Sequence, residues 1–170
     1  MSYGTIATWR MAHDGIVAAM DQLQAGQSAG DALETTIKMV EDYPFYKSVG
    51  FGGLPNAKGI LEMDAAFMDG DTFQIGAVAG IVDIKNPISV ARKLSNEKFN
   101  SFLVGQGATE YAIEAEFEQK EMLTDRAKKI WTNRLDDMKK HNLSPYDGHD
   151  TVGVVTLDSH GSMSAGTSSS

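Results

Sequence analysis

The chain has 170 residues, of which 42% are hydrophobic and 22% charged, and its formal net charge is -8. A chain of this size and composition can bury one hydrophobic core, which argues against a disordered or fibrous protein. Its basic residues are interspersed among acidic ones, whereas nucleic-acid phosphates require clustered Lys and Arg, so we expect no nucleic acid as a partner. There are no cysteines, which excludes disulfides and thiolate chemistry.

Two further absences bear on membranes and cofactors. No apolar run approaches the roughly 20 residues that a spanning helix needs, and the N-terminus lacks the basic and then apolar order of a secretory signal. We therefore expect a cytoplasmic protein with no membrane partner. The four histidines lack metal-binding spacing, and the Gly-rich stretch matches no nucleotide-binding pattern, so we expect no metal and no other cofactor.

The N-terminal part of the chain predicts one strand and two helices. Residues 4–9, GTIATW, indicate a short buried strand that ends before the breaker sequence HDG at 13–15. Apolar residues at helical spacing then indicate a helix over about 16–23. A second helix follows, with Ser28 as its capping residue and Pro44 beyond its end.

The middle of the chain predicts a loop, a hairpin and a helix. The sequence SVGFGGLPN at 48–56 packs three glycines and a proline into nine residues, which is typical of a sharply turning loop and a candidate site. Residues 59–68 and 72–79 read as two strands joined by a tight turn at Asp69-Gly70-Asp71. Pro87 is well placed as the first residue of a helix through Leu94.

Short elements and a linker follow. Residues 101–104 predict a strand, Gly-Gln-Gly at 105–107 a turn, and 108–117 a helix. A longer helix has its apolar face over 127–138. Residues 141–150, HNLSPYDGHD, resemble an exposed polar linker that is rich in turn formers.

The linker runs into two more predicted strands, 151–158 and 162–168, through the tripeptide His149-Asp150-Thr151. A threonine hydroxyl is a weak nucleophile, but a threonine at a chain terminus has its own α-amine beside it, with an ordinary pKa of about 7.7 to 8.0. Thr151 gains this amine only if the Asp150–Thr151 bond is cut. Taken alone, such a tripeptide before a strand is usually only a turn that ends in a strand residue.

Longer motifs decide between these two interpretations by resemblance. The sequence HDTVGVVTLDSHGSMSAGTSS at 149–169 is similar to the processing site of glycosylasparaginases and plant-type asparaginases. The loop SVGFGGLPN with LEMDAAFMDGDTFQIGAVAGI, the strand GTIATW, and the segments KNPISVARKL and FLVGQGATEYA resemble the same family. The chain is therefore identified as a member of the glycosylasparaginase and plant-type L-asparaginase (isoaspartyl peptidase) family of N-terminal nucleophile hydrolases, with the glycosylasparaginase branch favoured.

The resemblance implies an α+β fold, the four-layer αββα sandwich of these hydrolases. Residues 1–150 correspond to the α-subunit, with its polar linker at about 141–150, and 151–170 to the N-terminal stub of the β-subunit, together in one structural domain. In the family the β-subunit continues well beyond this stub. The expected partners are therefore the remaining β-subunit segment and a second αβ pair, giving an (αβ)2 assembly.

The resemblance also implies roles for individual residues. Thr151 would be the nucleophile and, through its freed α-amine, the base. Asp150 would assist the autocatalytic cleavage of the Asp150–Thr151 bond, unless it is only a turn residue, and His149 would be positional. Ser169, where the family usually has a second threonine, would hydrogen-bond near the nucleophile's amine.

Two residues are expected to bind substrate, and each has an ordinary structural alternative. Trp9 resembles the tryptophan that lines the pocket beside the scissile bond, but core packing is the alternative. Ser48 resembles the serine that anchors the substrate, but a turn residue before a Gly-rich loop is the alternative.

The implied substrate is a small-molecule asparagine derivative, cleaved through a β-aspartyl-enzyme ester. The Gly-rich loop favours N4-(β-N-acetylglucosaminyl)-L-asparagine, with L-asparagine and β-aspartyl peptides as alternatives within the family. A hypothesis of another class is a truncated, unprocessed precursor without activity, which acts at most as a binding or structural fragment.

Overall fold

In the computed structural model, which describes residues 2–141 and 151–170, six strands form one mixed sheet. The strands are β1 (Gly4–Ala7), β2 (Met63–Asp69), β3 (Ile75–Ile81), β4 (Phe102–Val104), β5 (Val152–Leu157) and β6 (Met163–Ser169). Their order is β1-β5-β6-β2-β3-β4, in which β3 and β4 pair in parallel and the other neighbours are antiparallel. The C-terminal hairpin β5–β6 therefore lies between the first strand and the middle of the chain, which brings distant segments together.

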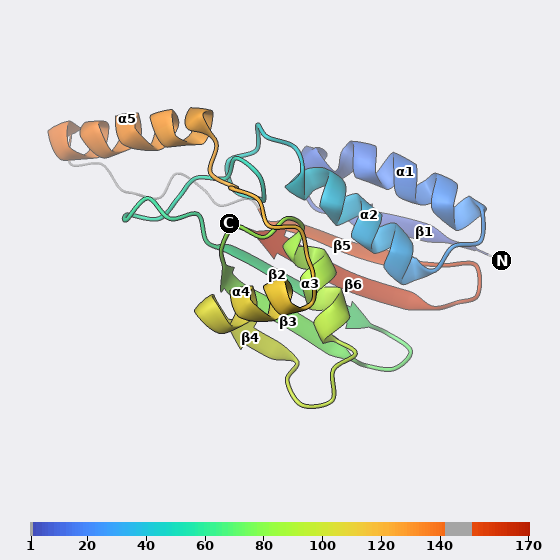
Figure 1. Cartoon of the computed structure of the whole chain (residues 1–170). Coiled ribbons are helices and arrows are strands. Elements are labelled where there is room, and N and C mark those ends of the chain that lie inside the picture. The colour runs from blue at the N-terminus through green and yellow to red at the C-terminus, as the bar shows by residue number, and fades with distance from the viewer. Residues whose placement is uncertain (1, 142–150) are drawn as a thin grey trace.

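Helices cover one face of this sheet (Figure 1). They are the 3-10 helix η1 (Arg10–Ala12), α1 (His13–Gln24), α2 (Ala29–Glu41), α3 (Pro87–Leu94), α4 (Gly105–Glu114) and α5 (Asp125–His141). Helix α2 packs on β5 and β6, and α3 packs on β2 and β3, whereas α5 extends away from the sheet (Figure 1). The architecture is α+β, as the sequence predicts.

The core lies between the helices and the sheet because each element is apolar on one side. Leu33, Ile37 and Val40 form the buried stripe of α2, and alternate residues of β2 and β5 are buried on the helical face of the sheet. The predicted cap of α2 is confirmed: the Ser28 hydroxyl accepts a hydrogen bond from the Asp31 backbone N–H at 3.1 Å. Local capping and burial thus agree on where α2 begins.

The other face of the sheet has no helix over it among the described residues, although it too is apolar. Ile6 is 71% exposed and Phe102 is 61% exposed. The large hydrophobic residues of this open face are Ile6, Ile75, Phe102, Val104, Val155 and Met163. Solvated sheet faces are normally polar, so this open face is unusually apolar for a surface in contact with water.

Several of the predicted elements differ in detail. The first strand ends at Ala7 and is partly exposed, not buried, and the sequence HDG at 13–15 lies inside α1 and does not break the chain. Strand β2 begins at Met63 and not at residue 59, and α4 already begins at Gly105. The predicted tight turn after Asp69 is wrong, because the connection between β2 and β3 runs from residue 70 to 74. Asp69 Oδ1 accepts hydrogen bonds from the backbone N–H groups of Asp71 and Thr72, at 3.1 and 2.8 Å, and so organises a wider connection.

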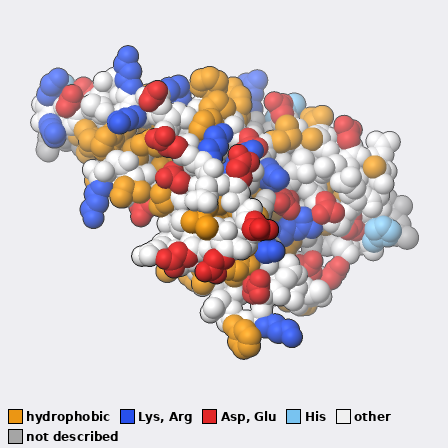
Figure 2. Space-filling view, in the orientation of Figure 1, with side chains coloured by type: hydrophobic (Ala, Val, Ile, Leu, Met, Phe, Trp, Pro, Cys, Tyr) orange, Lys and Arg blue, Asp and Glu red, His pale blue; other side chains and the backbone are white. Residues whose placement is uncertain are grey.

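Charged side chains are spread over the helical face. Figure 2 shows acidic and basic groups interspersed there, with hydrophobic side chains in small groups between them. Within residues 2–141 and 151–170, no helix combines the length and hydropathy needed to cross a membrane.

Gly50, in the Gly-rich loop, is held against the end of α2 and provides the first testable prediction. Its φ is +64°, and a Cβ added there would lie 2.3 Å from the Glu41 carbonyl oxygen. We expect Gly50→Ala to lower the free energy of unfolding by about 2 to 4 kcal/mol, since left-handed strain adds to overpacking. Gly26→Ala is the matched control: its φ is +84° but its added Cβ meets nothing within 4 Å, so only the strain cost of about 1 kcal/mol remains. Denaturant unfolding of both variants measures the difference, and equal losses would show that the close approach does not matter.

Candidate active site

Thr151 lies directly before β5, opposite the end of β6. The pairing of Val152 with Ser168 places Thr151 beside Ser169, and the Thr151 hydroxyl donates a hydrogen bond to the Ser169 hydroxyl at 3.0 Å. Both residues line a cleft of about 230 Å³ on the open face of the sheet. The hairpin therefore brings together two of the residues that the sequence singles out.

Thr8 fixes the backbone on both sides of Val152. Its hydroxyl donates to the Thr151 carbonyl oxygen at 2.9 Å and accepts from the Gly153 N–H at 2.8 Å. The Thr8 N–H in turn donates to the Gly153 carbonyl oxygen at 2.9 Å. This clamp holds the start of β5 in a defined orientation. Thr8 lies in the family-like segment GTIATW, but the sequence assigns it no role, and only the pairing of β1 with β5 shows what its hydroxyl bonds.

The cleft is apolar along its floor and polar at the end where Thr151 lies. Ala66, Ala77 and Phe102 contribute apolar surface from β2, β3 and β4. Thr167 also lines the cleft, and its hydroxyl donates to the Val152 carbonyl oxygen at 2.9 Å. A small organic molecule could thus place an apolar portion on the sheet and a polar group against the hydroxyls.

Ser48 is buried at the point where the Gly-rich loop meets the end of β6. Its carbonyl oxygen accepts a hydrogen bond from the Ser170 N–H at 2.8 Å. Ser48 therefore lies beside Ser170, the residue that follows Ser169. It is not among the residues that line the cleft. The contact shows why the loop matters for the site: it anchors the end of the strand that carries Ser169.

Trp9 follows Thr8 directly and has an unusual backbone. Its φ is +63°, which is a strained conformation for a bulky residue, and its side chain is 57% exposed. The exposure excludes ordinary core packing within the described residues, although Trp9 does not line the cleft. Asp150 and His149 lie outside the described residues.

Glu41 is a fully buried carboxylic acid behind the site. Its Oε1 accepts from the Ile88 N–H at 3.1 Å, its Oε2 accepts from the Asn86 side chain at 3.3 Å, and its carbonyl oxygen accepts from the Phe51 N–H at 2.7 Å. Burial raises the pKa of Glu41 from 4.5 to about 8, although its interactions with Ser168, Ile88 and Asn86 oppose that change. The residue thus joins α2, α3, the Gly-rich loop and β6.

Metal-binding side chains do not gather in the described part of the chain. Residues 2–141 and 151–170 contain no group of three or more His, Cys, Asp or Glu that could hold a metal ion. The cleft thus offers hydroxyl groups, backbone dipoles and one carboxylate, that of Asp64, which accepts a hydrogen bond from the Gly80 N–H at 2.8 Å.

Comparison with known proteins assigns this arrangement to a family. The family model described as Asparaginase matches residues 5–170, from β1 through the end of β6. The chain belongs to the asparaginase family. Among its relatives is an N(4)-(Beta-N-acetylglucosaminyl)-L-asparaginase of Elizabethkingia miricola, 37% identical over 94% of this chain and 46% of the relative. A plant-type L-asparaginase of Pyrococcus abyssi is 36% identical over 91% of this chain and 54% of that protein.

A third relative in the asparaginase family has a different name. An isoaspartyl peptidase/L-asparaginase of Rattus norvegicus is 34% identical over 86% of this chain and 44% of its own length. The chain thus spans about half the length of the curated relatives that it matches. The family resemblance seen in the sequence is confirmed, and relatives with all three names match to a similar degree.

Proposed function

We propose that the full-length protein is an autoprocessing N-terminal-threonine amidohydrolase that cleaves the side-chain amide of asparagine derivatives. The observation that carries the proposal is the position of Thr151. In an asparaginase-family chain, this residue starts a clamped strand, and its hydroxyl meets that of Ser169 in an open cleft. The backbone nitrogen of Thr151 is joined to the last residue of the polar linker, so cutting the chain there would break no strand of the sheet.

The first proposed step is the cleavage of the Asp150–Thr151 bond. The Thr151 hydroxyl attacks the carbonyl carbon of Asp150, so a C–O ester bond forms as the peptide C–N bond breaks and the hydroxyl proton ends on the freed amine. Water then hydrolyses the ester, which leaves a carboxylate on Asp150 and a hydroxyl on Thr151. The Asp150 side chain assists the acyl shift, and His149 has a positional role.

The second proposed step is turnover. The freed α-amine of Thr151 takes the proton of its own hydroxyl, whose oxygen attacks the side-chain amide carbon of the substrate. The leaving amine departs with a proton, a β-aspartyl ester remains on Thr151, and water releases aspartate. Ser169 orients the nucleophile through its 3.0 Å hydrogen bond. We assign substrate contacts to Trp9 and Ser48 on the family resemblance: neither lines the cleft, but Trp9 is exposed next to the Thr8 clamp and Ser48 adjoins the end of β6.

We further propose that the remaining β-subunit segment packs on the open face and completes an αββα sandwich. Burying the apolar area of the open face would contribute about 25 cal/mol per Å² to stability. A second sheet would match the flat shape of this face. The segment 1–150 would then be the α-subunit and 151–170 the start of the β-subunit, paired as (αβ)2. Gel filtration with multi-angle scattering of the full-length protein would contradict this assembly if it gave a single αβ mass.

The favoured substrate is N4-(β-N-acetylglucosaminyl)-L-asparagine, because the loop SVGFGGLPN resembles that branch of the family. L-Asparagine and β-aspartyl peptides are the alternatives. Assaying the full-length protein on all three compounds, together with its intact mass, tests the proposal. The proposal is supported if the intact mass shows two fragments, cut between residues 150 and 151, and if the protein hydrolyses at least one of the three amides. A persistent single chain without hydrolysis would instead favour an inactive, unprocessed precursor.

The hydrogen bond between Thr151 and Ser169 gives a second prediction. We expect Ser169→Ala to lower kcat/KM by about fivefold, because one hydrogen bond that orients the nucleophile is worth about 1 kcal/mol. Ser169→Thr keeps the hydroxyl and should retain most of the activity. Steady-state assays of the processed full-length variants measure both, and equal losses in the two would show that the hydroxyl is not what matters.

A further inference from the structure

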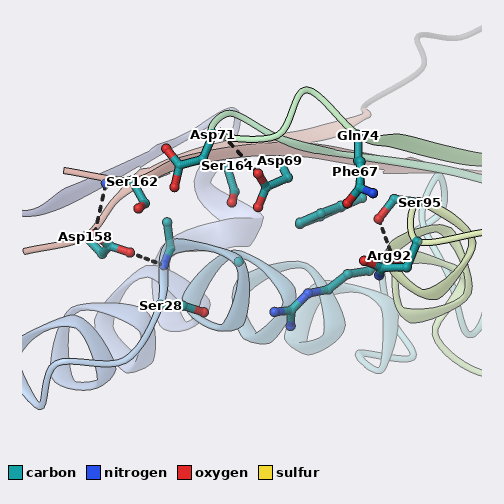
Figure 3. A pocket seen from close by; sticks show the side chains of 13 residues that line it. Ser28, Phe67, Asp69, Asp71, Gln74, Arg92, Ser95, Asp158, Ser162 and Ser164 are labelled. Atoms are coloured by element: carbon teal, nitrogen blue, oxygen red, sulfur yellow. Dashed lines mark hydrogen bonds between the residues drawn. The ribbon is translucent and has the colours of Figure 1, made fainter. Parts of the chain in front are cut away.

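A second cavity lies at the opposite end of β6 and on the helical face of the sheet. Its volume is about 220 Å³, and it shares no lining residue with the cleft at Thr151. Figure 3 shows it between the strand ends above and α2 below, with the side chains of Asp69, Asp71 and Ser164 directed toward the helix. It is smaller than the 300 to 1,000 Å³ typical of drug-sized ligand sites, so it suits a small molecule.

Carboxylates dominate the charge of this cavity. Asp69, Asp71 and Asp158 line it, and Arg92 is the one basic residue among its lining side chains. Arg92 already forms ion pairs with two residues that do not line the cavity, Asp31 at 2.7 Å and Glu34 at 2.6 Å. The guanidinium also acts on Asp69 and helps to lower the pKa of that carboxyl, but one guanidinium shared in this way against three lining carboxylates leaves the cavity negative.

Two of these carboxylates have a lowered pKa. Hydrogen bonds from Thr72 hold the pKa of Asp69 below its ordinary value. Burial alone would raise the pKa of Asp158, but the backbone N–H groups of Ala29, His160 and Ser162 outweigh it, and the net shift is downward. The cavity consequently keeps its negative charge at neutral pH.

Several acceptors in the cavity remain free. Both oxygens of Asp158 and Oδ1 of Asp69 accept hydrogen bonds from the protein. By contrast, the Asp71 carboxylate and Oδ2 of Asp69 accept none in the part of the chain that the structure describes. Ser164 is only 4% exposed, and its hydroxyl points into the cavity with no partner among the described residues. Because its oxygen is open to the cavity, the Ser164 hydroxyl is available to bond a ligand there.

From this geometry we propose that the cavity binds a small molecule through a primary ammonium group, which donates to Asp69, Asp71 and Ser164. An ammonium group has one positive charge and three N–H donors, which matches the free acceptors and the net negative charge of the cavity. The described acidic side chains form no group that could hold a metal ion, which favours an organic cation. The ammonium belongs either to a simple amine or to a zwitterionic amino acid whose carboxylate reaches Arg92. This site is independent of the proposed amidohydrolase reaction.

Calorimetric titration of the full-length protein tests the proposal with three probes. Ethanolammonium represents a simple amine, glycine a zwitterion, and tetramethylammonium a cation of the same charge without N–H donors. We expect saturable binding of ethanolammonium, glycine or both, one molecule per chain, and no binding of tetramethylammonium. Tighter binding of glycine would identify the zwitterion as the source, and tighter binding of ethanolammonium the simple amine.

Conservative variants locate the binding. Asp71→Asn and Ser164→Ala should each weaken the binding about tenfold, the usual worth of a hydrogen bond to a charged group. Asp136→Asn removes an equal charge from an exposed position on α5 and should leave binding unchanged. The proposal is overturned if neither ethanolammonium nor glycine binds, if tetramethylammonium binds equally well, or if Asp71→Asn and Ser164→Ala bind like the unmodified protein.

Discussion

Thr151→Ala is expected to abolish both the cleavage of the Asp150–Thr151 bond and the hydrolysis of asparagine derivatives. The variant lacks the hydroxyl that attacks in both steps, and removing a nucleophile of this kind typically lowers kcat by on the order of 10⁴-fold or more. Intact mass and an amidohydrolase assay of the full-length variant measure the two losses.

Two companion variants separate chemistry from folding. Thr151→Ser keeps the hydroxyl but loses the Cβ methyl that restricts χ1, so we expect slowed but measurable cleavage and turnover. Thr132→Ala removes a hydroxyl on exposed α5 that bonds only the Lys128 carbonyl within the described residues, and should behave like the unmodified protein. Normal turnover by Thr151→Ala would contradict the proposed mechanism outright.

The second large effect concerns pH and Glu41. The pKa of Glu41 is raised from 4.5 to about 8 in the folded state, chiefly by burial. The folded protein therefore keeps a proton that the unfolded chain releases, and stability must fall as pH rises through this window. Above pH 8 the decrease in the free energy of unfolding is complete. At 1.36 kcal/mol per pKa unit, its upper limit is roughly 5 kcal/mol.

Glu41→Gln isolates this contribution because glutamine keeps the shape and remains neutral. We expect the free energy of unfolding of the unmodified protein to decrease between pH 5 and 8.5, and the decrease to be smaller by several kcal/mol in the variant. The lowered pKa values of Asp31, Asp69 and Asp158 act below about pH 4 and do not overlap this range. Denaturant unfolding of both proteins at pH 5 and 8.5 measures the two decreases. Equal decreases would show that Glu41 is not the cause of the pH dependence.

Local chemistry explains which elements the sequence predicts. Helix α3 runs from Pro87 to Leu94 as expected, because proline suits the first helical turn and the apolar residues that follow share one face. The start of β2 is not visible in the same way. Asn56 Oδ1 accepts hydrogen bonds from the N–H groups of Lys58 and Ile60, which holds an apolar-looking stretch in a turn. Such side-chain contacts compete with strand formation and leave no periodic signal.

The site is only partly visible in the sequence for a related reason. Thr151 and Ser169 stand in a motif, and the hairpin that joins them is local in the chain. Thr8 reaches Thr151 only because β1 pairs with β5, across 143 residues. Glu41 is one of many acidic residues until packing shows that it is fully buried. Long-range strand order and desolvation, which no short pattern encodes, therefore determine the rest of the site.

The most direct test follows the nucleophile through one turnover. The full-length protein is mixed with N4-(β-N-acetylglucosaminyl)-L-asparagine, quenched in acid, and mapped by peptide mass spectrometry. We expect a β-aspartyl group in ester linkage on the hydroxyl of Thr151, in a peptide whose free N-terminus is Thr151 itself. An acyl group on another residue, or turnover by protein whose Asp150–Thr151 bond is intact, would contradict the central claim.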